Sequence, residues 1–153
     1  MPRRGQNKAQ LSETGACGGA DRRATVLLEH TTLDGVHYDW MLEDPAGGPE
    51  AQLITFRLSR PAQEWPARRR WGLIELGAHR RAYLSYEGPL SGQRGHVRRV
   101  AAGWYRPCRW SEGHIILRLE LITCVATLEL KRRGGKRWVG SVLQANTDQD
   151  RLF

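Results

Sequence analysis

The feature that most constrains the fold is the absence of any long stretch with helical spacing. Short runs rich in β-branched and aromatic residues alternate apolar and polar positions, and glycine or proline turns separate them. No segment keeps a 3.6-residue apolar repeat for three turns. About six to eight short strands joined by turns predict an all-β fold, an antiparallel β-barrel or sandwich. The expected strands are 25–30, 36–43, 51–58, 71–76, 96–105, 115–122, 126–133 and 137–145, with an extended segment at 80–88.

The chain has 153 residues, enough for one domain with a buried core. Residues 1–24 are polar, glycine-rich and aperiodic, so we expect a disordered basic tail followed by a single domain at 25–153. No apolar run approaches the roughly 20 residues of a membrane span, and the N-terminus lacks the apolar core of a secretory signal. We therefore expect a cytoplasmic monomer without a membrane partner.

The three cysteines, Cys17, Cys108 and Cys124, lie far apart, and none belongs to a CxxC pair. This spacing predicts neither a zinc cluster nor a disulfide framework. We expect three unpaired thiols.

Charge changes sign along the chain. Residues 25–56 contain six acidic residues and no lysine or arginine, whereas residues 57–99 contain ten arginines and three glutamates. A metal-assisted phosphate site needs one segment that favours cations and another that favours anions, and the net charge of +8 is compatible with a polyanionic partner. A patchy surface in an arginine-rich protein would give the same pattern.

The segment around Asp34-Gly35 predicts a β-hairpin that gathers metal ligands. With these two residues as the turn, His30 pairs with Asp39, and His37 projects on the same side because strand side chains alternate. Two imidazoles and one carboxylate would then form a facial set suited to Mn²⁺, Fe²⁺ or Zn²⁺. The opposite face, with Trp40, is apolar, which directs the ligands towards a surface groove.

A second polar segment, HRRAYLSYEG (79–88), offers His79 and Tyr83 with Arg80 and Arg81 between them. An imidazole, a phenol and guanidinium groups can together hold the oxygens of a phosphate. Ordinary surface residues would also account for this spacing.

Three motifs resemble one family. HYDWMLE (37–43) is similar to the HYDFRLE-type signature of the 3′-phosphoesterase domain of bacterial ATP-dependent DNA ligase D. HRRAYLSYEG (79–88) is similar to its HPLDYADFEG segment, and GQRGHVRRVAAG (92–103) to its GxYGAGTVxVWDxG segment. The resemblance runs from about Thr25 to Gln144, and here the domain stands alone.

The resemblance implies a small β-barrel with a crescent groove. It also implies an Mn²⁺-dependent activity that removes a 3′-terminal ribonucleoside and then the remaining 3′-phosphate, leaving a 3′-OH for end joining. DNA or RNA 3′ ends would be the substrates, with a ligase and a polymerase of an end-joining system as possible partners. The family's metal ligands fall on His30, His37 and Asp39, and its phosphate-binding histidine and tyrosine fall on His79 and Tyr83.

The sequence departs from the family at three points. Met41 replaces an arginine that contacts the scissile phosphate, and a thioether cannot supply that charge. His30 and His37 are seven residues apart instead of six, which indicates a different turn. A lysine-bearing PKGP segment is represented only by RLSRP (57–61). We expect weak metal-dependent activity, with the missing charge supplied from elsewhere. The candidate phosphate-binding cations are Arg57, Arg60, Arg70, Arg80 and Arg81.

Two alternatives remain open. The chain could be a binding module that holds a nucleic-acid 3′ end without turnover, and Met41 favours this hypothesis. It could also be a non-haem iron oxygenase, because His37, Asp39 and His79 spell an HxD…H facial triad. The identity of the bound metal, Mn²⁺ or Fe²⁺, would separate the two enzymes.

Overall fold

The computed structural model describes residues 21–59, 65–66, 70–122 and 124–147. Residues 1–20 of the predicted tail and the candidate Arg60 lie outside the described residues. The first strand begins at Arg23, two residues before the expected start. The elements are β1 (Arg23–Thr32), β2 (Gly35–Glu43), β3 (Leu53–Leu58), β4 (Arg70–His79), η2 (Arg81–Leu84, a 3₁₀ helix), β5 (Gly88–Pro89), β6 (His96–Ser111), β7 (His114–Leu121), β8 (Cys124–Gly134) and β9 (Arg137–Thr147).

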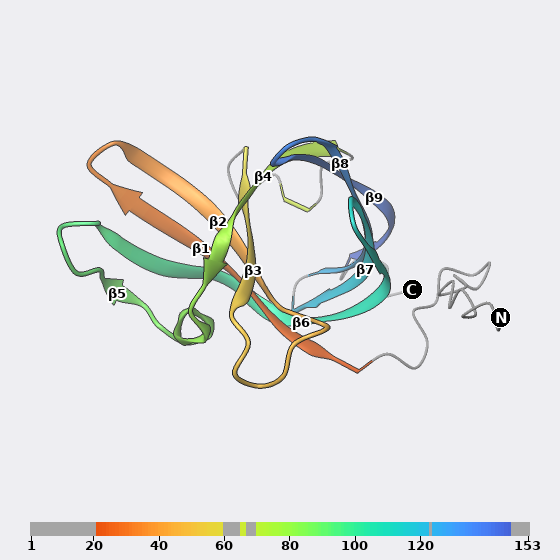
Figure 1. Ribbon diagram of the computed structural model, residues 1–153, viewed down its shortest axis with the longest axis horizontal. Coiled ribbons are helices and arrows are strands. Elements are labelled where there is room, and N and C mark those ends of the chain that lie inside the picture. The colour runs from red at the N-terminus through yellow and green to blue at the C-terminus, as the bar shows by residue number, and fades with distance from the viewer. Residues whose placement is uncertain (1–20, 60–64, 67–69, 123, 148–153) are drawn as a thin grey trace, which may run out of the picture.

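The strands form one antiparallel sheet that closes into a ring (Figure 1). The order is β1-β2-β3-β4-β9-β8-β7-β6, and β6 pairs back with β1. The short β5 adds to β6 outside the ring. Closure pairs the edges of a sheet that would otherwise be open. The predicted antiparallel β-barrel is confirmed.

Strand alternation fills the interior of the ring with large apolar side chains. Trp40 and Leu42, which the sequence places on the apolar face of β2, are fully buried here. Their neighbours in the same cluster include Phe56, Trp71 and Tyr105. The aromatic rings contact one another at an angle, as in the Trp40–Phe56 pair with ring centroids 6.2 Å apart. This core fixes which residues of each strand face outwards.

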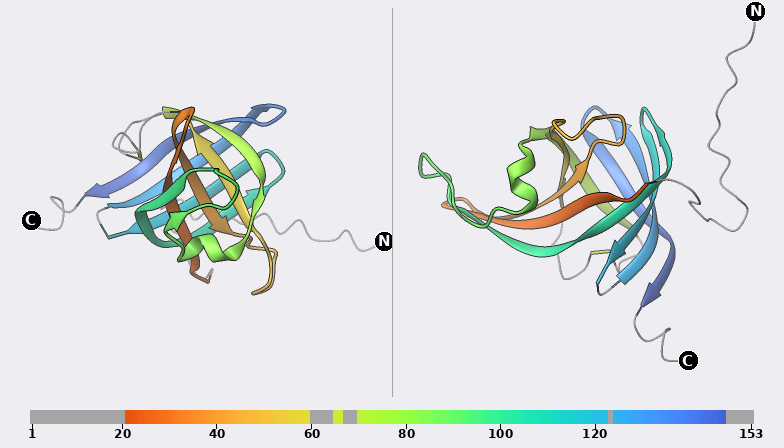
Figure 2. Two further views of the ribbon diagram at one scale, coloured as in Figure 1. Left: turned by 90° about the vertical axis from the view of Figure 1, so that its left-hand side faces the viewer. Right: turned by 90° about the horizontal axis from the view of Figure 1, so that it is seen from below.

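A second, smaller apolar cluster lies on the outer face of the barrel. It contains Val26, Leu28, Met41, Leu53 and Val97, and side chains of η2 and the β5–β6 turn pack against it. In Figures 1 and 2, β1, β2 and β6 project beyond the ring, with η2 and β5 alongside them. The outer face is therefore partly covered near this projection.

The expectation of an extended 80–88 segment is wrong for residues Arg81–Leu84, which form η2. Its turns are closed by hydrogen bonds from the Tyr83 and Ser85 amides to the carbonyls of Arg80 and Ala82, each 3.1 Å long. A turn lets the adjacent Tyr83 and Leu84 both pack on the outer cluster. Strand alternation would have pointed one of them away.

The β1–β2 hairpin forms with a different register from the one expected. His30 opposes His37, and Thr32 opposes Gly35, so the turn residues are Leu33 and Asp34. The hydroxyl of Thr32 accepts from the Asp34 amide at 3.1 Å and donates to the Gly35 carbonyl at 3.3 Å. These side-chain bonds favour the observed turn. The shift moves each partner by two positions, so the expected faces are unchanged.

Cys108 is disulfide-bonded, so the expectation of three unpaired thiols is wrong for this residue. Pairing requires two Cα atoms about 4.4–6.8 Å apart, a proximity that the fold decides and the spacing along the chain does not. Within the described part of the chain, no helix has the length and apolar character needed to cross a membrane.

Gly140 gives a test of how tightly the core is packed. A Cβ at this position would overlap the ring of the buried Trp71, which packs in the core with Trp40 and Trp65. We expect Gly140→Ala to lower the free energy of unfolding by about 1–3 kcal/mol, as overpacked cores do. Gly134→Ala, where a Cβ meets nothing within 4 Å, is the control and should change stability little. Chemical denaturation of both variants measures the difference; equal stabilities would contradict the described packing.

Candidate functional site

Two histidines face each other at the hairpin end of the outer face. His30 and His37 are direct cross-strand partners, and their ring centroids lie 6.3 Å apart. The His30 Nε2 lies 2.7 Å from the carbonyl oxygen of Arg94. Because a carbonyl oxygen only accepts, Nε2 carries the proton, and the lone pair of the neutral ring is on Nδ1. Metal-binding histidines commonly hold their second nitrogen in this way.

The contact between His30 and Arg94 depends on Gly95. This glycine has a φ of +83°, and a Cβ there would overlap the carbonyl of Thr31 in β1. Only glycine combines that conformation with so close an approach. The Leu90 amide also donates to the Gly95 carbonyl at 2.7 Å, which closes the β5–β6 turn over the hairpin. The motif 92–103 thus positions the backbone that orients His30.

Asp39 lies on the same face but is engaged by an arginine. The carboxylate is nearly buried, with 3% of the residue exposed, and Arg57 on β3 is its cross-strand partner. The Arg57 Nε donates to Oδ1 at 3.0 Å, and Nη2 lies 3.5 Å from Oδ2. Arg57 is one of the predicted phosphate-binding cations, but in this arrangement it neutralises a protein carboxylate instead.

The donor chemistry of His30, His37 and Asp39 fits a divalent transition metal, with two imidazole nitrogens and one carboxylate on one face. Among the residues that the structure describes, however, no group of three His, Cys, Asp or Glu side chains stands ready to hold an ion. A carboxylate has about four lone-pair positions, so Asp39 could bind a metal while keeping one bond to Arg57. The metal site stays a prediction.

The structure brings His79 and Tyr83 together, as the motif predicts. His79 ends β4 and Tyr83 lies in η2, with ring centroids 5.8 Å apart. The His79 Nδ1 donates to the Gly77 carbonyl at 2.8 Å, so Nε2 is the nitrogen left to contact a ligand. Tyr86 extends the group, with its ring centroid 6.5 Å from that of Tyr83.

The sheet register separates the two halves of the predicted site. His79 opposes Leu53, which in turn opposes Glu43. His37 lies six positions from Glu43 along β2, or about 20 Å. His37 and His79 therefore do not meet at one ion, which argues against the facial-triad oxygenase. The His79–Tyr83 pair and the His30–His37 pair occupy different parts of one face.

A pocket of about 330 Å³ lies between these halves. It is lined by residues 80–94, so the arginine-rich segment forms it, as the charge pattern suggests. Two of its lining residues connect it to the two halves of the predicted site. The Tyr83 ring contacts His79, and the Arg94 carbonyl accepts a hydrogen bond from His30. The full lining is Arg80, Ala82, Tyr83, Tyr86, Pro89, Leu90, Ser91 and Arg94.

The remaining expected arginines have different positions. Arg80 lines the pocket. Arg81 forms an ion pair of 2.7 Å with Glu43. Arg70 begins β4, nine residues from His79 at the other end of the strand, or about 30 Å away. Arg70 is therefore not a phosphate ligand together with His79.

Sequence reasoning missed Arg94, Arg99 and Tyr86. Arg94 and Tyr86 line the pocket, and Arg99 opposes Leu28 beneath η2. The Arg99 Nη2 donates to the Leu84 carbonyl at 3.2 Å, while its buried Nε has no hydrogen-bond partner among the described residues. None of the three arginines Arg80, Arg94 and Arg99 is ion-paired with a described carboxylate. The ten arginines in 57–99 indicate that this segment could bind an anion, but the sequence does not show which of them face the pocket.

Met41 does not leave an open place for a cation. Only 2% of this residue is exposed, and it packs in the outer apolar cluster with Val26, Leu28 and Leu53. The position that carries an arginine in the resembled family is thus part of the support beneath η2. Comparison with models of protein families and with curated proteins gives no match to this chain.

The burial of Met41 predicts the effect of restoring the arginine. We expect Met41→Arg to lower the free energy of unfolding by at least about 2 kcal/mol, because it buries a charge without a partner. The matched control Met41→Leu keeps the volume and should cost less than about 1.5 kcal/mol. Denaturation with urea measures both. A fully stable Met41→Arg protein would contradict the packing of this cluster.

Glu43 fixes η2 to the sheet, and its titration should be visible in stability. Burial raises the pKa of Glu43, but the Ala24 amide, Arg81 and Arg23 together outweigh it and leave the pKa below 4.5. A lowered pKa means that the stabilisation is present above the unfolded-state pKa and is lost as the pH falls through the folded-state pKa.

We therefore expect Glu43→Gln to cost about 1.5–3 kcal/mol at pH 7, in line with hydrogen bonds to charged groups. The difference from the wild type should shrink below pH 4.5. The exposed Glu87→Gln is the control and should leave the curve unchanged. Thermal unfolding between about pH 3 and 7 gives the comparison, and a constant difference over that range would exclude this role for Glu43.

Proposed function

We propose that this chain is a metal-dependent 3′-phosphoesterase that acts on nucleic-acid 3′ ends, related to the end-processing domain of DNA ligase D. The observation that carries the proposal is the pairing of His79 with Tyr83 beside an arginine-lined pocket, on the same sheet face as His30 and His37. The sequence motifs also support it, because HYDWMLE supplies His37 and HRRAYLSYEG supplies His79 and Tyr83 in the same order as in the resembled family.

In the proposed reaction, a terminal phosphate enters the pocket from the side of η2. The Tyr83 hydroxyl donates a hydrogen bond to one of its oxygens, and His79, which already donates from Nδ1 to the Gly77 carbonyl, donates from Nε2 in its imidazolium form. Arg80 and Arg94 neutralise the negative charge, which grows in the transition state. Arg99 adds a cation beneath η2, where its buried Nε has no hydrogen-bond partner among the described residues. Arg80, Arg94 and Arg99 thus replace the charge that Met41 lacks.

The proposed Mn²⁺ would be held by His30, His37 and Asp39. When bound, such an ion polarises a phosphoryl oxygen and lowers the pKa of a bound water. The chain's own contribution is to orient His30 through the Arg94 carbonyl and to hold Asp39 beside it on the same face. Arg57 holds the Asp39 carboxylate in place through the bond from its Nε to Oδ1.

A binding module is the second candidate function. It is favoured by the distance between the halves and by the Asp39–Arg57 ion pair, which occupies the expected carboxylate ligand. In this role, the pocket would hold a 3′-phosphate end without hydrolysing it, and a ligase or polymerase of an end-joining system would act on that end.

The decisive experiment is a primer–template with a 3′-phosphate, incubated with and without Mn²⁺. We expect slow Mn²⁺-dependent release of phosphate. His79→Ala should reduce the rate about 10²-fold, because it removes a donor at the developing charge. His114→Gln is the matched control, since His114 binds Glu129 with a 2.8 Å contact away from the site.

The outcomes separate the candidates. Phosphate release that His79→Ala leaves unchanged would contradict the assigned pocket. No release by the wild type, together with binding of the 3′-phosphate end that His79→Ala weakens, would favour the binding module. Neither release nor binding would exclude both.

A further inference from the structure

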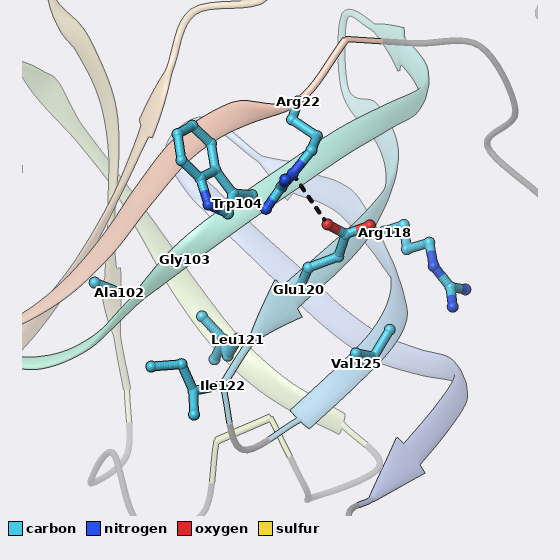
Figure 3. Close-up of a pocket in the computed structure, with 9 residues that line it drawn as sticks. All are labelled: Arg22, Ala102, Gly103, Trp104, Arg118, Glu120, Leu121, Ile122 and Val125. Carbon is cyan, nitrogen blue, oxygen red and sulfur yellow. Dashed lines mark ion pairs between the residues drawn. The ribbon is translucent and has the colours of Figure 1, made fainter. Parts of the chain in front are cut away.

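A second pocket lies on the barrel's outer face. It is separate from the first pocket, lined by residues 80–94, which is called the η2 pocket below. It has a volume of about 680 Å³ and is formed by β6, β7, Ile122 after β7, the start of β8 and the chain before β1 (Figure 3). One of its lining residues is an exposed aromatic residue, Trp104, with 43% of its surface exposed. Ile122, at the other end of the pocket, is 89% exposed (Figure 3). The lining comprises Arg22, Ala102, Gly103, Trp104, Arg118, Glu120, Leu121, Ile122 and Val125.

The register places Trp104 on the same side of the sheet as the η2 pocket. Tyr105 points into the core, so its neighbour Trp104 points outwards. Arg99, which binds the carbonyl at the end of η2, opposes Leu28 of the outer cluster and so also faces outwards; a register shift in the β1–β6 pairing lies between Arg99 and Trp104, so their odd spacing does not put them on opposite faces. Ala102 packs at the edge of the outer cluster and lines the second pocket. One continuous surface along β6 therefore connects the two pockets.

The chemistry of this pocket suits a planar group attached to negative charge. The Arg22 guanidinium already stacks on the Trp104 ring, 4.8 Å from its centroid. Figure 3 shows it between that ring and the Glu120 carboxylate, with Arg118 on the other side of Glu120. Glu120 is paired with Arg22 at 3.4 Å and with Arg106 at 3.3 Å. The single carboxylate is thus more than compensated, and the surroundings stay positive.

We propose that Trp104, with Arg22 and Arg118, is a stacking subsite for a base of a single nucleic-acid strand whose 3′ end lies in the η2 pocket. The ligand assignment rests on the proposed function, since that function makes nucleic acid the substrate. Every base presents a flat face to an aromatic ring, and arginines follow the phosphates, so recognition here is independent of sequence. The subsite holds the strand a few nucleotides upstream of the reacting phosphate.

Fluorescence anisotropy of a 5′-fluorescein dodecathymidylate with a 3′-OH tests the subsite without any turnover. We expect Trp104→Ala to weaken binding at least about tenfold, whereas Trp104→Phe keeps a ring and should stay within about threefold of the wild type. Arg118→Ala should lower the slope of log affinity against log salt by about 0.7, the value for one phosphate of a single strand. Arg109→Ala, which removes an exposed arginine of β6 outside the pocket, is the charge control.

Several results would overturn the subsite. One is an affinity that Trp104→Ala leaves unchanged, and another is an equal loss in Trp104→Ala and Trp104→Phe. A third is a wild-type dimer in sedimentation that Trp104→Ala dissociates without changing oligonucleotide binding, since the pocket would then be an interface between copies of the chain.

The subsite and the proposed turnover can fail separately. Weakened binding by Trp104→Ala in a protein that releases no 3′-phosphate would support the subsite and contradict the turnover. Release of 3′-phosphate, combined with oligonucleotide binding that Trp104→Ala leaves unchanged, would support the turnover and contradict the subsite.

Discussion

The pairing of β6 with β1 is the interaction on which the rest of the structure depends. It turns an open antiparallel sheet into a closed ring and so decides which side of each strand is inside. Trp40 and Tyr105 fill that interior. Because side chains alternate, their neighbours Asp39 and Trp104 must then face outwards. The candidate site and the second pocket are both consequences of where the core lies.

The outer face is built by a second layer of interactions that uses charges for structure. Glu43 binds Arg81, and Arg99 binds the carbonyl of Leu84, so η2 is held on the sheet from both sides. Met41 contributes apolar support beneath it. Arg57 is likewise committed to a carboxylate. The arginines left for a ligand are fewer than the sequence suggests, and those that line the pocket come from the segment between β4 and β6.

Much of the site could be predicted, but not its geometry. The motifs identify His79 and Tyr83 as a pair, and the structure places their rings in contact. The hairpin places His30 beside His37, although Thr32 selects a register that differs by two positions from the one expected. The local sequence alone did not show this, because the Asp34-Gly35 turn signal competes with the Thr32 hydroxyl, which favours a turn at Leu33 and Asp34. Nor could it show that Arg70 lies at the far end of its strand from His79.

The sequence by itself determined the strands, their apolar faces and the alternation that brings the polar residues to one side, because these depend only on local patterns of period two. It also carried the motifs that suggest a 3′-phosphoesterase. Tertiary structure alone decided which arginines are committed to a protein carboxylate, that Met41 is buried, and that Trp104 and Arg99 share a face of the sheet. These properties depend on contacts between strands distant in the chain, such as β1 with β6, and no local pattern encodes the register of such a pairing.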